Sequence, residues 1–104
     1  MTRKASSTEP RPTLQVDIER ILEEIRASIP DERMSVRMVV PEILRVAKRP
    51  MTVTEIAMVA ARLFPTLLTP REAIEHVLKN LFIRGEVARA PDEQDKRRFV
   101  YFLP

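Results

Sequence analysis

The stretch LFIRGEVARAPDEQDKRRFVYFL, residues 81–103, contains Gly85, the only glycine in this chain of 104 residues. An apolar run with helical spacing precedes the glycine. Two β-type runs follow it, EVARA at 86–90 and RFVYFL at 98–103, and the polar loop PDEQDKR separates them. Because glycine readily adopts the left-handed conformation that ends helices, the stretch predicts a helix that stops at Gly85 and a β-hairpin directly after it.

The helix before Gly85 is expected to span residues 70–84. The segment TPRE at 69–72 supplies its start, with Thr69 as the N-cap, Pro70 at the first helical position and Glu72 closing a capping box. Apolar residues three and four positions apart then mark one buried face, which consists of Ile74, Val77, Leu78 and Leu81. The opposite face is charged and is expected to lie in solvent.

Two further helices are predicted upstream. The segment TVTE at 52–55 forms another capping box, from which an apolar-periodic helix starts. Proline suits the first position of a helix, so a preceding helix is expected to begin at Pro41. Lys48 and Arg49 lie in its last turn, where positive charge suits the helix dipole, and Pro50 ends it. This helix carries the apolar residues Ile43, Leu44, Val46 and Ala47.

The N-terminal part divides into two segments. Residues 1–13, which are basic and contain two prolines, predict a disordered arm that is either inert or follows a DNA groove. Residues 14–29 predict an amphipathic helix, too short to be stable alone, that packs either on its own domain or on a second copy in a homodimer. We favour the homodimer. The apolar stripe consists of Leu14, Ile18, Ile21, Leu22, Ile25 and Ile29.

The composition excludes several kinds of site. The chain has no cysteine and one histidine, His76, so neither a disulfide framework nor a thiolate or histidine-cluster metal site is expected, and no cofactor or catalytic activity is predicted. No apolar run is long enough to span a membrane and no secretory signal is recognised, so the protein is expected in the cytoplasm. The net charge of +3 falls entirely in residues 48–104, which carry ten basic and seven acidic residues. This uneven charge fits a polyanionic partner.

The pattern from 41 to 103 resembles the winged helix-turn-helix family. The resemblance is carried by ILRVAKRPMTVTEIA, TPREAIEHVLKNLFIRGEVARA and PDEQDKRRFVYFL, and it is closest to bacterial regulators of the multiple-antibiotic-resistance (MarR) type. It implies a mainly α fold with a small β-hairpin, an α+β class, in which residues 30–104 form the winged domain behind the N-terminal amphipathic helix. It also implies sequence-specific binding of double-stranded DNA and a role in transcription regulation.

The resemblance also implies which residues contact DNA. The helix 70–84 would enter the major groove and the loop 91–97, the wing, would lie on the backbone or in the minor groove. The candidate residues are Arg71, Glu75, His76 and Lys79 on the helix, Lys96, Arg97 and Arg98 at the wing, and Lys48 and Arg49 at the end of the first helix of the domain.

Two acidic residues on the same helix favour a different interpretation. Glu72 closes the capping box, but Glu75 faces the expected phosphates and must either accept from cytosine or pair with Lys79. Otherwise the helix faces a protein. The second hypothesis is therefore a winged-helix module for protein–protein interaction in a replication, segregation or transcription complex.

Overall fold

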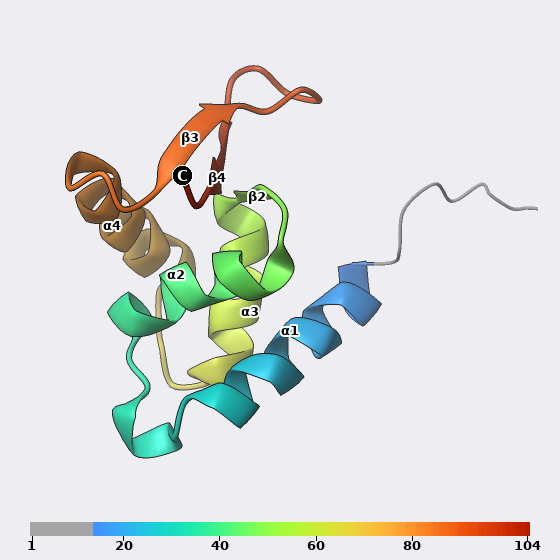
Figure 1. The fold of residues 1–104 in the computed structure, drawn as a ribbon, viewed down its shortest axis with the longest axis vertical. Helices are drawn as coiled ribbons and strands as arrows, with labels where there is room; N and C mark the ends of the chain where they lie inside the picture. Colours follow the sequence, from blue (N-terminus) through green and yellow to red (C-terminus); the bar gives the residue numbers. More distant parts are fainter. Residues whose placement is uncertain (1–13) are drawn as a thin grey trace, which may run out of the picture.

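The computed structural model describes residues 14–104, with side chains from Asp17 onward. It is mainly helical, with a small three-stranded antiparallel sheet at one end (Figure 1). The elements, in chain order, are α1 (Leu14–Ser28), the 3-10 helix η1 (Asp31–Arg33), α2 (Val36–Ala47), β2 (Met51–Thr52), α3 (Val53–Leu63), α4 (Pro70–Ile83), β3 (Ala88–Pro91) and β4 (Phe99–Phe102). The expected α+β class is thus confirmed, and the predicted arm at 1–13 lies outside the described residues. None of the helices within 14–104 has the length and apolar character that crossing a membrane requires.

Helix α1 packs against α2 and α3 of its own chain (Figure 1). The apolar stripe is buried in the same core as the other helices, through Ile18, Ile21, Leu22, Ile25 and Ile29. The expectation that this stripe forms a homodimer seam is therefore corrected: the intrachain core already covers it. Packing on its own domain, the alternative interpretation of the sequence, is the observed arrangement. The side chain of Leu14 lies outside the described part of the chain.

Helix α2 begins earlier than the sequence indicated. It starts at Val36 behind Ser35, whose hydroxyl oxygen accepts a hydrogen bond from the backbone N–H of Met38 at 3.2 Å. Pro41 lies inside the helix and was wrongly expected to be its first residue. The proline removes one helical hydrogen bond. The additional turn before it is capped by Ser35 and contributes two completely buried valines, Val39 and Val40.

The junction between α2 and α3 adds an element that sequence patterns missed. Met51 and Thr52 form the two-residue strand β2, which pairs antiparallel with β4 opposite Tyr101 and Val100. Thr52 is also the N-cap of α3: its hydroxyl accepts from the N–H of Glu55 at 3.2 Å, and the Glu55 carboxylate accepts from the N–H of Thr52 at 2.9 Å. The predicted capping box is confirmed, and the sheet has three strands rather than two.

Helix α4 starts at the predicted residue, Pro70, and ends at Ile83, one residue earlier than predicted. Pro70 occupies its first turn, but the side chain of Thr69 makes no capping hydrogen bond, so the second predicted capping box is not formed. Gly85 follows with φ +76°, and the N–H groups of Gly85 and Glu86 bond the carbonyls of Phe82 and Leu81 at 3.0 and 2.9 Å. This is a Schellman motif, which satisfies the last carbonyls of the helix and confirms Gly85 as its stop.

The sheet has the order β2–β4–β3, with β4 in the centre. The predicted hairpin is confirmed as β3 and β4, which pair from Ala88 opposite Phe102 to Pro91 opposite Phe99. Since side chains alternate across a strand, Phe99 and Tyr101 share one face of β4 while Val100 and Phe102 share the other. The first face continues the core, because Tyr101 and Met51 are buried there together.

Candidate nucleic-acid interface

The exposed face of α4 carries the residues that the sequence assigned to DNA. Ile74, Leu78 and Leu81 are buried against the core, and Val77 is partly buried. The spacing therefore directs Arg71, Glu75, His76 and Lys79 outward, and all four are exposed or partly exposed. The predicted division of the helix into a buried stripe and a polar face is confirmed.

A hollow of about 310 Å³ brings helix and hairpin residues together. It opens between the start of α3, the first half of α4 and strand β4. Four of the predicted residues line it, namely Arg71, Glu75, Arg97 and Arg98, beside Thr52, Val53, Thr54, Phe99 and Tyr101. Residues that lie more than twenty positions apart in the sequence thus form one basic, partly aromatic surface.

Arg71 links α4 to the start of α3. One terminal nitrogen donates to the hydroxyl of Thr54 at 2.6 Å, and its Nε lies 3.6 Å from a carboxylate oxygen of Glu75. The sequence left Glu75 to cytosine or to Lys79; the structure pairs it with Arg71, four residues towards the N-terminus. Both partners are more than half exposed, and an ion pair of this kind contributes about 0–1 kcal/mol. Glu75 therefore holds Arg71 only weakly.

The other two candidate residues of α4 differ in their contacts. The Nε2 atom of His76 lies 3.3 Å from the side-chain amide nitrogen of Asn80, one turn later in the helix. Among residues 17–104, no carboxylate lies within ion-pair distance of Lys79. Its ammonium group thus adds a positive charge to this face that no described carboxylate neutralises.

The loop between β3 and β4, residues 92–98, is ordered by its own aspartates. Asp92 accepts from the Nε of Arg98 at 2.7 Å, and Asp95 accepts from the backbone and the Nε of Arg97, each at 3.1 Å. The hydrogen bonds from Arg97 lower the pKa of Asp95, and the hydrogen bond to Asp92 raises the pKa of Arg98. Lys96 is exposed between these pairs, and none of the described carboxylates forms an ion pair with it.

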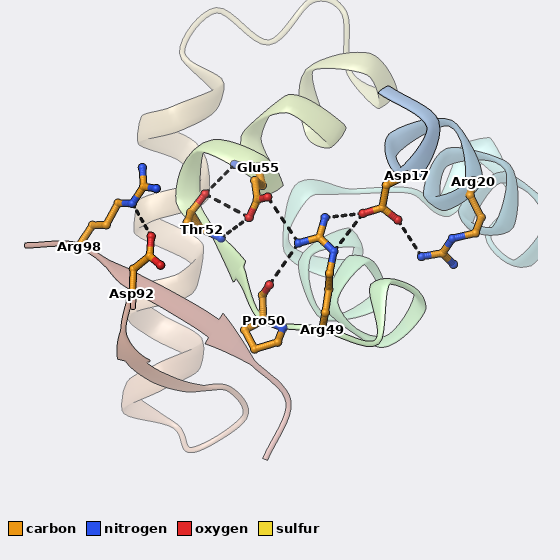
Figure 2. Close-up of polar contacts among 8 residues, drawn as sticks. All are labelled: Asp17, Arg20, Arg49, Pro50, Thr52, Glu55, Asp92 and Arg98. Atoms are coloured by element: carbon orange, nitrogen blue, oxygen red, sulfur yellow. Dashed lines mark hydrogen bonds and ion pairs between the residues drawn. The ribbon is translucent and has the colours of Figure 1, made fainter. Parts of the chain in front are cut away.

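Two predicted DNA contacts lie on another part of the surface. Lys48 is the left-handed C-cap of α2, with φ 59°, and lines a hollow with Phe102 and Leu103, on the side of the sheet opposite Tyr101. Arg49 points towards α1 and stays one-third exposed: its Nε donates to Asp17 at 3.0 Å, and a terminal nitrogen lies 3.4 Å from Glu55 (Figure 2). The structure therefore does not bring these two residues together with α4, although Arg49 lines a hollow of about 630 Å³ together with Asp92 and Arg98 of the hairpin.

The contacts of Arg49 have an electrostatic consequence for α1. Burial alone would raise the pKa of Asp17, but hydrogen bonds from Arg49 and Arg20 outweigh it and hold that pKa below the ordinary value. Figure 2 shows the resulting chain of contacts, which runs from Arg20 on α1 through Asp17 and Arg49 to the capping box of α3. Arg49 is thus a structural link between α1 and the α2–α3 junction.

Sequence reasoning missed Arg89 in β3. Its guanidinium carbon lies over two exposed aromatic rings, 4.2 Å from the centroid of Phe82 and 4.4 Å from that of Phe99. The alternation of side chains along the two hairpin strands could have indicated this contact. Arg89 pairs with Tyr101, and Phe99 lies two residues before Tyr101 on the same face of the sheet. Sequence reasoning also missed Thr54, the acceptor for Arg71.

The described residues contain no group of three or more His, Cys, Asp or Glu side chains placed to hold a metal ion. The surface formed by α4 and the hairpin carries arginines, threonine hydroxyls and aromatic rings beside the carboxylate of Glu75. Comparison of the chain with models of protein families, with curated proteins and with solved structures yields no significant match.

Proposed function

We propose that the chain is a winged-helix protein that binds double-stranded DNA and regulates transcription, with α4 in the major groove and the loop 92–98 on the backbone or in the minor groove. The order helix, strand, helix, helix, strand, loop, strand supports the winged-helix interpretation, as does the sheet order β2–β4–β3. In such a domain the last helix and the loop of the hairpin point towards the same ligand.

The observation that carries the proposal is the shared hollow. Arg71 from the helix and Arg97 and Arg98 from the hairpin line a single surface. The pair of Arg71 with Glu75 is more than half exposed on both sides, so it is of the solvent-exposed type that phosphate can replace. Arg97 and Arg98 are themselves at least half exposed, although the side chains of their partners Asp95 and Asp92 are only 33% and 13% exposed. Lys79 and Lys96 flank this surface with charges that bind no described carboxylate.

The proposed binding mode does not depend on α1. The stripe of α1 is covered by the core of its own chain, so we propose that one copy engages one site on the duplex. The interface consists of the exposed face of α4, the loop 92–98 and the start of α3. Lys48 and Arg49 are left out of it, because the first lines a hollow on the other side of the sheet and the second holds Asp17.

Binding to a random pool of short duplexes, followed by fluorescence anisotropy at increasing salt, tests the proposal. We expect Lys79→Gln/Lys96→Gln to weaken binding and to reduce the slope of log K against log salt by about two, since each phosphate contact contributes about 0.9. The matched control, Lys48→Gln/Arg33→Gln, removes the same charge away from this surface and is expected to keep the slope. Absence of duplex binding by the wild type at about 50 mM salt would refute the proposal.

One observation supports the second candidate, a protein-interaction module. An apolar hollow of about 460 Å³ lies between α3 and the start of α4, lined by Ala57, Met58, Ala61 and Pro70 among others. Met58 is 41% exposed, and Glu72 also lines this hollow. A complex with a protein that survives nuclease treatment and is lost in Met58→Asp, together with no duplex binding, would favour this function.

A further inference from the structure

Arg89 occupies a position that no other arginine of this surface shares. Its guanidinium carbon lies 4.2 Å from the ring centroid of Phe82, at the end of α4, and 4.4 Å from that of Phe99, at the start of β4. Both rings are exposed, at 37% and 40%. The side chain thus joins the end of the helix to the hairpin at the rim of the proposed interface.

Local structure fixes this arrangement. The Schellman turn at Gly85 ends α4 at Ile83, one residue after Phe82, and leads the chain into β3. Within the hairpin, Arg89 is the partner of Tyr101 and Pro91 is the partner of Phe99, so Arg89 and Phe99 lie diagonally on one face of the sheet. This is the face that continues the core past Tyr101.

The charge of Arg89 is not matched by an acid. Arg71, Arg84, Arg97 and Arg98 each form an ion pair with a nearby carboxylate. Within residues 17–104, Arg89 has neither an ion pair nor a side-chain hydrogen bond, and its partners are aromatic rings. Rings attract the cation but provide no oxygen acceptors, so the N–H donors of the guanidinium remain unused.

The rings also position the group. A cation–π contact at an exposed site is worth about 0.5–1 kcal/mol, and two such contacts restrict a side chain that otherwise samples many rotamers. A cation that is already positioned loses less conformational freedom on binding an anion. The planar guanidinium can donate two parallel hydrogen bonds to one phosphate, which an ammonium group cannot do.

We propose that Arg89, held by Phe82 and Phe99, binds a phosphate of the DNA backbone between the end of α4 and the hairpin. The proposal rests on the proposed function, since it names a further contact of the same interface. Arg89 can bind a phosphate directly. Arg71, Arg97 and Arg98 must first release the carboxylates with which they are paired.

Duplex binding at increasing salt, with folding monitored by circular dichroism, tests the role of the charge. Arg89→Gln is expected to weaken binding of all sequences in the pool alike and to reduce the salt slope by about one. Arg26→Gln, which removes an exposed charge on α1, is the matched control and is expected to bind as the wild type does. A folded Arg89→Gln variant that binds with the affinity and slope of the control would overturn the proposal while leaving the proposed function intact. A wild type that binds no duplex would instead refute the proposed function.

Two conservative changes test the role of geometry and cover the case in which Arg89→Gln does not fold. Arg89→Lys keeps the charge but loses the planar donor pair, so we expect weaker binding with an unchanged slope. Phe82→Leu/Phe99→Leu keeps Arg89 but removes the rings, and it is expected to weaken binding in the same way. Wild-type affinity in both folded variants would show that neither the planar group nor its positioning by the rings contributes, and would overturn the proposal.

Discussion

Arg49 reaches across 32 positions of sequence to Asp17 and thereby ties α1 to the junction of α2 and α3. The guanidinium simultaneously contacts Glu55, whose carboxylate caps α3 by accepting from the N–H of Thr52. A residue that the sequence assigned to DNA is therefore better explained as part of the fold.

Removing this link is expected to destabilise the protein without affecting duplex binding. Arg49→Ala leaves the largely buried carboxylate of Asp17 with Arg20 alone, and hydrogen bonds to charged groups contribute about 2 kcal/mol. Urea denaturation measures the loss. The control is Arg45→Ala, which breaks an exposed pair with Glu42 and is expected to change stability by less than about 1 kcal/mol. Equal losses in the two variants would contradict the assignment.

The stability of the fold should decrease in acid through Asp17. Its pKa in the folded chain lies below the ordinary value of 3.8, so the unfolded chain takes up the proton first. The stabilisation by Asp17 is therefore complete at neutral pH and is lost as the pH falls from about 3.8 through the lower folded value. Urea denaturation of wild type and Asp17→Asn at several pH values should show a difference that narrows in acid. A constant difference would contradict this role.

The burial of α1 predicts how its core variants behave. Ile21 is fully buried within the chain, and truncation of such a residue to alanine costs about 2–5 kcal/mol. We expect Ile21→Ala to lower the free energy of unfolding by about 3 kcal/mol. The unfolding midpoint of the wild type should also not depend on protein concentration, as it would if this stripe joined two copies. A folded Ile21→Ala monomer derived from a wild-type dimer would restore the dimer interpretation.

Gly85 predicts a purely conformational penalty. Its φ is +76°, and a Cβ added at this position would meet no atom within 4 Å, so a side chain there meets strain but no clash. Gly85→Ala is expected to cost about 1–2 kcal/mol in urea denaturation. Gly85→Asn should lose less, because asparagine tolerates the left-handed region. Equal stability of wild type and Gly85→Ala would indicate that the helix ends in another way.

Residues that start or end helices made much of the fold predictable from the sequence. The capping box of Thr52 and Glu55, the proline at the start of α4 and the single glycine after it each favour the start or the end of a helix, and each is found where the sequence indicated. The exposed face of α4 follows from the spacing of Ile74, Leu78 and Leu81. Each of these features depends on residues that are close in the sequence, so a short stretch of sequence is enough to predict it.

The remaining features depend on tertiary contacts. Pro41 is tolerated inside α2 because the earlier start buries Val39 and Val40, a gain that no local rule records. Strand β2 exists only because Met51 and Thr52 find β4, which lies far along the sequence. The surface at Arg89 depends on the register between β3 and β4, which brings an arginine and two phenylalanines from three elements together.

The brevity of β2 has a consequence for behaviour at high concentration. Within residues 14–104, the two outer strands of the sheet are the two-residue strand β2 and strand β3, which ends at Pro91, a residue without an N–H to donate. Neither edge offers a long row of unpaired backbone groups on which another chain could add a strand. We therefore expect that this sheet does not start amyloid-like growth in the folded state, and that aggregation through it requires at least partial unfolding.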